Sequence, residues 1–200
     1  MTKTVEFYYD FGSPNTYMAN RVLPEILKRT QARVSYRPVL LGGIFKATNN
    51  QAPWMTFSKV QAKMNYMAME MKRFAKKHGL DKYRLNPHFP LNTLLLMRGA
   101  IVAQDRGEID RYIQVGERCV WEEGLKMDDP EVFIEAFTAA GFDGAALVQS
   151  TREPEVKQKL IAYTEDAVKK GLFGLPSFIV NDELFFGKDS LHDIEDELAA

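Results

Sequence analysis

Apolar and polar side chains partly alternate from Val5 to Asp10, and this spacing of two residues predicts a β-strand. The stretch Gly12-Ser13-Pro14 then interrupts the pattern, and apolar residues recur at helical spacing as far as residue 29. Ser13 suits the N-cap of that helix, and Pro14 suits its first position because the missing N–H costs nothing there. A second strand is predicted over 33–39, so the segment has the length of a right-handed parallel β–α–β unit.

Helical spacing dominates the middle of the chain. From residue 58 to about 171 the pattern predicts helices broken by short Pro, Gly and Asp punctuation, without strands. Near the end, 177–180 and 184–186 predict two short strands joined through Asn181-Asp182, a favourable hairpin turn. A last helix is expected over 189–199.

This order predicts an α/β protein with a thioredoxin-like fold. The order is β–α–β, a long helical block, then β–β–α, and the two ends are expected to form one sheet. We therefore expect a single unit in which 1–45 and 172–200 make the thioredoxin-like part and 46–171 is a helical insertion. The length of 200 residues, with 46% apolar composition, is enough for one well-packed core.

Charge and hydropathy exclude several classes of partner. The chain has 26 basic and 27 acidic residues, so no overall field favours nucleic acid or an anionic membrane. Apolar runs such as 94–97 are far shorter than the roughly 20 residues of a bilayer span. With no targeting signal in the sequence, a cytoplasmic location is the default expectation.

Cys119 is the single cysteine, which excludes an internal disulfide, a C-x-x-C redox centre and a thiolate-rich metal site. We expect it to be an inert, small buried residue. His78, His88 and His192 lack the spacing of metal ligands, so no metal is expected.

Two local features could carry chemistry. A helix N-terminus stabilises an anion, and a hydroxyl such as that of Ser13 can donate to a ligand's sulfur and lower that thiol's pKa. The simpler alternative is that Ser13 is only a cap. The Leu175-Pro176 bond is either cis or trans, and in the cis form the backbone of Leu175 would be free to pair with an extended peptide. The alternative is a proline that merely opens a strand.

Three separated motifs together resemble one family. They are the stretch 9–14 (YDFGSP), the stretch 46–53 (KATNNQAP), and the pair 174–178 (GLPSF) and 186–189 (FGKD). The chain resembles 2-hydroxychromene-2-carboxylate isomerases and kappa-class glutathione transferases over essentially its whole length. The resemblance implies a DsbA-like fold, glutathione as cofactor or cosubstrate, and a homodimer.

The resemblance also implies residue roles. The catalytic serine corresponds to Ser13, and the other glutathione-binding positions correspond to Asn50, Lys59, Leu175, Pro176, Gly187, Lys188 and Asp189. Taken singly, each has a simpler explanation, such as a turn residue, a solvated lysine or a helix cap. Two positions depart from the usual pattern: Asn49 replaces glycine and Ser190 replaces arginine. Asn tolerates a left-handed conformation, whereas the loss of arginine weakens the neighbourhood of Asp189.

Further positions are candidates for binding an aromatic substrate. Lys46 resembles a lysine that contacts the substrate carboxylate in the isomerases. Trp54 and Phe89, with the methionine stripe at 64, 67 and 71, are candidates for an apolar pocket. The alternative is that these residues belong to the core or to a dimer contact.

The family's reaction is the isomerisation of 2-hydroxychromene-2-carboxylate in aromatic degradation. It implies reversible addition of a Ser13-stabilised glutathione thiolate, rotation about the resulting single bond, and elimination. Two alternatives stay open. One is net conjugation of glutathione to an electrophile, as in a transferase, and the other is a non-catalytic thioredoxin-like binding module. Disulfide exchange is disfavoured because residues 13–16 contain no thiol.

Overall fold

The computed structural model describes residues 3–200, and its N-terminal part is the predicted β–α–β unit. Strand β1 (Thr4–Tyr9) leads into helix α1 (Pro14–Thr30), and strand β2 (Arg33–Pro38) returns parallel to β1. The left-handed Gln31, with φ of 56°, ends α1 and turns the chain back toward β2. The parallel crossover predicted from the sequence is confirmed.

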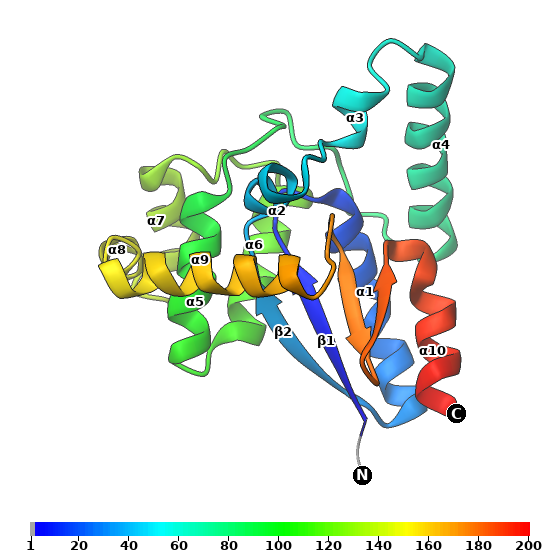
Figure 1. The fold of residues 1–200 in the computed structure, drawn as a ribbon. Coiled ribbons are helices and arrows are strands. Elements are labelled where there is room, and N and C mark those ends of the chain that lie inside the picture. Colours follow the sequence, from blue (N-terminus) through cyan, green and yellow to red (C-terminus); the bar gives the residue numbers. More distant parts are fainter. Residues whose placement is uncertain (1–2) are drawn as a thin grey trace.

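The C-terminal strands complete the same sheet. Strands β3 (Ser177–Val180) and β4 (Glu183–Phe186) form an antiparallel hairpin, and β3 also pairs antiparallel with β1. The strand order is β2-β1-β3-β4, so residues from both ends of the chain form one mixed sheet, as predicted (Figure 1). Asn181 and Asp182 both have positive φ, 50° and 66°, which suits the twist of a two-residue hairpin.

The last helix begins later than predicted. Lys188–Ser190 form a short 3-10 turn (η1), and helix α10 covers Leu191–Ala199 rather than starting at Asp189. The turn arises because Gly187 takes a φ of 86° and the Ser190 hydroxyl donates to the Gly187 carbonyl at 2.8 Å.

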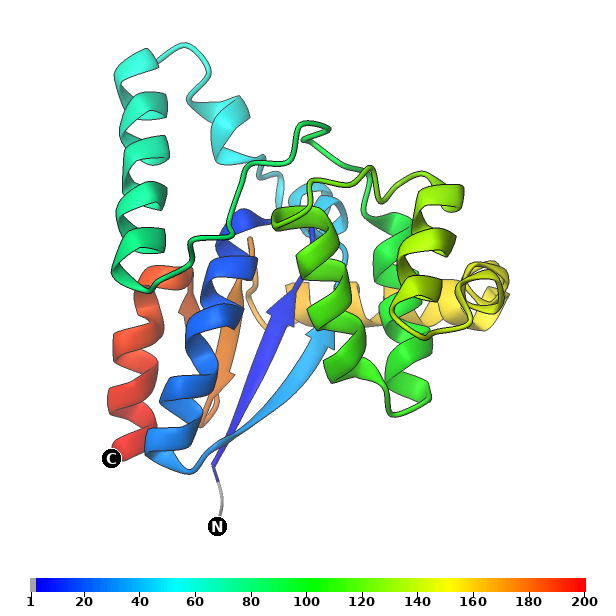
Figure 2. The same cartoon turned by 180° about the vertical axis from the view of Figure 1, so that it is seen from behind.

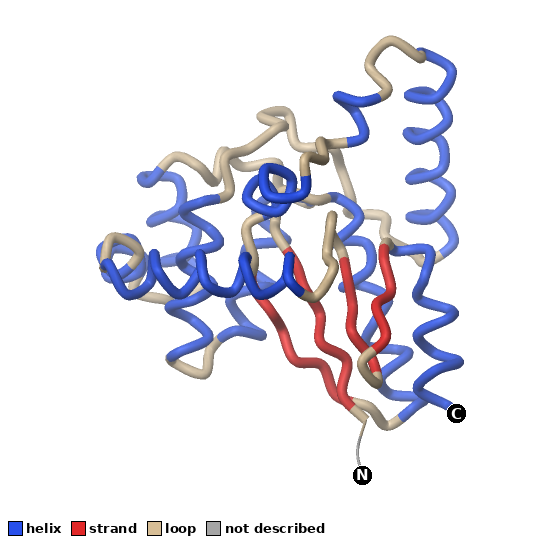
Figure 3. The backbone as a smooth tube through the Cα atoms, in the orientation of Figure 1, coloured by secondary structure: helices blue, strands red, loops and turns tan. Residues whose placement is uncertain are grey.

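The middle of the chain is helical, as predicted. Its helices are α2 (Leu41–Thr48), α3 (Pro53–Thr56), α4 (Gln61–Lys77), α5 (Leu94–Asp105), α6 (Ile109–Trp121), α7 (Pro130–Ala139), α8 (Gly144–Ser150) and α9 (Pro154–Lys169). Two details differ from the prediction. Helices α2 and α3 lie before residue 58, where the predicted helical run begins, and 78–93 form a long loop, tan in Figure 3. Within 3–200, every helix is too short or too polar to cross a membrane.

Helices cover both faces of the sheet. Helices α1, α6 and α10 lie on the face turned to the viewer in Figure 2, whereas α2 and α9 lie on the face seen in Figure 1. On the α1 face, Phe7 stacks on Phe178 with ring centroids 4.7 Å apart. On the α9 face, Tyr8 packs with Val39, Ile44 and Leu175. Helix α4 extends beyond the sheet above α10 and has no buried residue.

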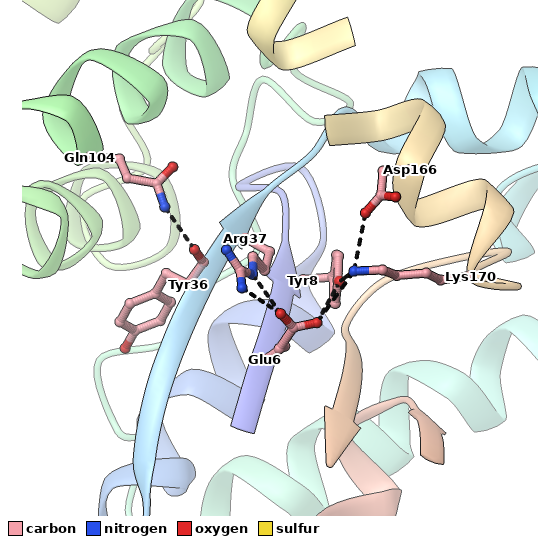
Figure 4. Close-up of polar contacts among 7 residues, drawn as sticks. All are labelled: Glu6, Tyr8, Tyr36, Arg37, Gln104, Asp166 and Lys170. Carbon is pink, nitrogen blue, oxygen red and sulfur yellow. Dashed lines mark hydrogen bonds and ion pairs between the residues drawn. The ribbon is translucent and has the colours of Figure 1, made fainter. Parts of the chain in front are cut away.

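A polar cluster holds α9 against the sheet. The Lys170 ammonium, just after α9, lies 3.0 Å from the Tyr8 hydroxyl and 3.1 Å from an Asp166 oxygen (Figure 4). The Glu6 carboxylate accepts from the Tyr8 hydroxyl at 2.8 Å and pairs with the Arg37 guanidinium on β2. These contacts attach the C-terminal end of α9 to strands β1 and β2.

Candidate functional site

Ser13 lies where β1 passes into α1, and its hydroxyl makes two contacts. As N-cap of α1 it accepts from the Thr16 N–H at 3.3 Å, and it donates to the Leu175 carbonyl at 3.1 Å. The side chain is buried. It therefore sits at the positive end of the α1 dipole, facing the loop before β3. The predicted cap is confirmed, and the tertiary fold adds the contact with Leu175.

The Leu175-Pro176 peptide bond is cis, which decides the alternative that the sequence left open. The Pro176 carbonyl accepts from the Gly187 N–H at 2.9 Å, so this loop is bound to the turn that follows β4. Within 3–200, the N–H of Leu175 makes no hydrogen bond. The loop beside Ser13 thus presents a free backbone donor.

Asn50 is also tied to this loop. Its side-chain N–H donates to the Phe173 carbonyl at 2.8 Å, and its side-chain oxygen accepts from the Gln51 N–H at 2.8 Å. The preceding Asn49 takes a φ of 52°, so the predicted tolerance of a left-handed residue at this position is confirmed. Asn50, the loop around Leu175 and Ser13 are therefore linked through successive contacts.

Asp10 is a site residue that the sequence analysis did not single out. Its buried carboxylate accepts from the Gly12 N–H and from the Leu41 N–H, both at 2.8 Å. Burial raises the pKa of this carboxyl, although both N–H donors and a hydrogen bond with Thr93 act in the opposite direction. Asp10 therefore attaches the turn that contains Ser13 to the first residue of α2. The sequence did contain a signal for this role, because Asp10 is an acidic residue at the end of an apolar strand and directly before the turn.

An open cavity of about 420 Å³ lies beside this turn. Its lining includes Asp10, Gly12 and Asn50, together with the aromatic rings of Trp54 and Phe89. The two rings meet edge to face with centroids 6.0 Å apart. The structure thus brings Asn50, Trp54 and Phe89 from the predicted set together beside the turn that precedes Ser13, although they are far from it in sequence.

Lys188 is buried in an ion pair. Its ammonium lies 2.6 Å from a Glu70 oxygen, 2.9 Å from an Asp189 oxygen and 4.8 Å from the centre of the Phe74 ring. Asp189 is adjacent, and its side chain is 78% exposed. The Lys188 charge is therefore neutralised within the protein, whereas the Asp189 carboxylate faces solvent.

Several predicted residues lie away from this group. Lys46 lies on another face of α2 and lines a second cavity, separate from that of Trp54 and Phe89. Lys59 is exposed between α3 and α4 and has no ion pair among residues 3–200. The methionines at 64, 67 and 71 are half-buried on α4 and line neither cavity.

Cys119 lies in the core on α6. Burial raises the pKa of its thiol to about 11. The thiol is protonated at neutral pH and out of contact with solvent, so it fits the predicted inert role. Any thiolate chemistry at Ser13 would need a thiol from outside the chain.

Comparison with known proteins identifies the family of this chain. The family model of the DSBA-like thioredoxin domain matches residues 4–199. A 2-hydroxychromene-2-carboxylate isomerase of Sphingobium xenophagum is 28% identical over 99% of each chain, and human glutathione S-transferase kappa 1 is 26% identical over 96% of this chain and 88% of its own.

Solved structures show the same fold. A 2-hydroxychromene-2-carboxylate isomerase structure superposes with a TM-score of 0.83 at 24% identity, covering 96% of this chain and 93% of its own. A probable DsbA oxidoreductase from Streptomyces coelicolor gives a TM-score of 0.75 at 18% identity, over 98% and 88% of the two chains. The chain belongs to the DSBA-like thioredoxin-domain family.

Proposed function

We propose that this protein is a glutathione-dependent isomerase of aromatic degradation intermediates of the 2-hydroxychromene-2-carboxylate type. The observation that carries the proposal is the position of Ser13, at the N-terminus of α1 and against the cis Leu175-Pro176 loop. Support also comes from the full-length similarity to relatives of that name. Their reaction is extended to this chain as part of the proposal.

The groups around Ser13 fit glutathione. The Ser13 hydroxyl has one proton, so donation to a sulfur replaces its bond to the Leu175 carbonyl. That carbonyl and the unpaired Leu175 N–H then become an acceptor and a donor for an extended peptide, such as the cysteinyl unit. The exposed Asp189 carboxylate complements the γ-glutamyl ammonium group. Lys188 fits less well as a direct ligand, because Glu70 and Asp189 already neutralise its charge.

Glutathione would supply the thiol nucleophile that adds to the conjugated substrate and leaves unchanged. The chain's contribution is to keep that sulfur ionised, through the Ser13 hydroxyl and the positive end of α1. Trp54 and Phe89 offer flat apolar walls for an aromatic ring. Lys59 contacts none of these groups, and its predicted role in binding glutathione stays a proposal. Lys46 lines the separate cavity, so its predicted contact with the substrate carboxylate is not part of this proposal.

A second candidate is glutathione transfer to an electrophile. The similarity to glutathione S-transferase kappa 1 favours it, and the same Ser13 site would serve both reactions. Product analysis separates the two: an isomerase returns free glutathione, whereas a transferase releases a thioether. A thioredoxin-like binding module would bind glutathione and give neither product.

The experiment is ultraviolet difference absorbance of the protein mixed with glutathione, because a thiolate absorbs where a thiol does not. We expect a thiolate band in the wild type and in Ser58→Ala, an exposed serine outside the site, and none in Ser13→Ala. The wild type should then isomerise 2-hydroxychromene-2-carboxylate. The proposal is wrong if glutathione does not bind, or if its ionisation is the same without the Ser13 hydroxyl.

A homodimer and a cytoplasmic location belong to the same proposal. Sedimentation equilibrium of the full chain tests the first, with a mass of twice 22.8 kDa expected. Fractionation of cells expressing the untagged chain tests the second.

A further inference from the structure

A second cavity, of about 490 Å³, lies between α2, α5 and α9. From α2 it is lined by Gly43, Lys46 and Ala47, whereas the Trp54 cavity touches Leu41, Gly42 and Phe45 of the same helix. The two cavities share no lining residue. Helix α2 is therefore a wall between two separate spaces.

The second cavity is preformed. The Leu40 N–H donates to the Thr164 hydroxyl oxygen at 3.0 Å, and this hydroxyl in turn donates to the Leu160 carbonyl at 2.8 Å. These bonds join the start of α2 to α9, and the Lys170 cluster holds the C-terminal end of α9 on the sheet. The volume lies in the range of small-molecule sites, roughly 300 to 1,000 Å³.

Unpaired cations surround this cavity. Lys46, Arg98 and Lys157 line it from three different helices, and among residues 3–200 none of them forms an ion pair. The Nε atom of Arg98 is buried and has no hydrogen-bond partner. A buried donor without an acceptor is costly, and an anion would satisfy it. Glu165 is the one acidic residue in the lining, so the local charge is positive.

The rest of the lining is largely apolar. Leu160 and Val168 lie on α9, and Ile161 exposes 49% of its surface there. An apolar ligand that covers this surface removes it from water, which is favourable. The cavity thus combines an apolar wall with a guanidinium whose planar donors match a carboxylate.

We propose that this cavity binds a small organic carboxylate with an apolar body, at a site separate from that of Ser13. Arg98 receives the carboxylate, Lys46 and Lys157 add positive potential, and the apolar body lies along Ile161 and Val168. An aromatic acid and a fatty acid share this chemistry, and the experiment distinguishes them.

The test is isothermal titration of the full chain with 1-naphthoate, dodecanoate and the neutral 1-naphthalenemethanol. We expect either 1-naphthoate or dodecanoate to bind, depending on which apolar group fits the cavity. The alcohol should bind at least tenfold more weakly than that carboxylate. Arg98→Gln and the exposed Ile161→Asp should each weaken carboxylate binding about tenfold. Lys169→Gln, an exposed lysine of α9 outside the cavity, is the matched control and should stay within about twofold of the wild type.

The proposal is overturned if neither carboxylate binds, or if the alcohol binds as tightly as the acid. It is also overturned if glutathione competes with the carboxylate or if Trp54→Ala abolishes its binding, because the ligand would then occupy the first cavity. Circular dichroism confirms the fold of each variant, and Ile161→Asp provides the test if Arg98→Gln does not fold. Since the site excludes Ser13, glutathione ionisation and carboxylate binding can fail independently.

Discussion

The Ser13 hydroxyl donates to the Leu175 carbonyl at 3.1 Å, although the two residues are 162 positions apart in the chain. This bond closes the gap between the N-terminus of α1 and the cis-proline loop before β3. Only one proton is involved, so a ligand sulfur at Ser13 and the Leu175 carbonyl compete for the same donor. Without a ligand, the Ser13 hydroxyl is therefore bonded to the Leu175 carbonyl. A thiol peptide can take over both groups, because its sulfur accepts from Ser13 and its backbone N–H donates to Leu175.

A cysteine at this N-cap would test the electrostatics directly. In Ser13→Cys we expect a thiol pKa at least about one unit below the ordinary value near 8.5, because the positive end of α1 stabilises a thiolate. The measurement is the rate of alkylation by iodoacetamide against pH. Cys119 gives little background, since burial raises its pKa to about 11.

Ser58→Cys is the matched control, since Ser58 is exposed and does not begin a helix. Its thiol should titrate near the ordinary value. If the two engineered thiols titrate alike, the N-terminus of α1 does not stabilise an anion at this position.

The Asp10 carboxylate is expected to be a positioning group for the Ser13 turn. In Asp10→Asn, the amide nitrogen cannot accept a hydrogen bond, so either the Gly12 N–H or the Leu41 N–H loses its partner. We expect a loss of about 1–3 kcal/mol in the free energy of unfolding by urea and weaker glutathione binding. Asp81→Asn, at an exposed position, should change neither. Unchanged stability in Asp10→Asn would show that these bonds do not hold the turn.

Glu117 on α6 should make stability fall as the pH rises. Its carboxylate accepts from the Asn20 side chain at 2.9 Å and lies 3.8 Å from the Arg21 guanidinium, yet burial dominates and raises its pKa to about 8. The unfolded chain, with a value of 4.5, releases this proton earlier. The protonated Glu117 side chain therefore contributes its full share of the folding stability below pH 4.5. This stability is lost as the pH rises from 4.5 to about 8.

The measurement is urea unfolding of the wild type and of Glu117→Gln across this range. The free energy of unfolding of the wild type should decline relative to the variant, by at most about 1.4 kcal/mol per pH unit. Parallel curves for the two proteins would mean that Glu117 is ionised in the folded state.

Helix α4 should depend on the pair between Glu70 and Lys188. The helix has no buried residue, and this 2.6 Å contact ties it to the turn before α10. In Glu70→Gln we expect amide hydrogen exchange across 61–77 to accelerate roughly tenfold while the strands stay protected. Lys72→Gln, at an exposed position on the same helix, should leave exchange unchanged. Equal exchange in both variants would contradict this role.

Much of the fold follows from local pattern. Alternation predicted β1, the Ser-Pro pair predicted the start of α1, and Asn181-Asp182 predicted the hairpin, because each depends on side chains within a few residues. The start of the last helix was missed because Gly187 and Ser190 form a local turn that competes with helix. The length of the loop at 78–93 was missed because Asn86 holds it by donating to the Val120 and Leu125 carbonyls, which lie far away in the sequence.

The candidate site was likewise predictable only in part. The sequence alone determined that Ser13 caps a helix, that the chain has a single cysteine, and which motifs resemble a known family. Only the tertiary structure decided that Ser13 meets Leu175, that Asp10 holds the turn, that Lys188 is neutralised and that Lys46 faces a different cavity from Trp54. The physical reason is that capping and periodicity depend on neighbours along the chain, whereas burial, ion pairing and cavity walls depend on groups that meet only when the sheet and its helices have assembled.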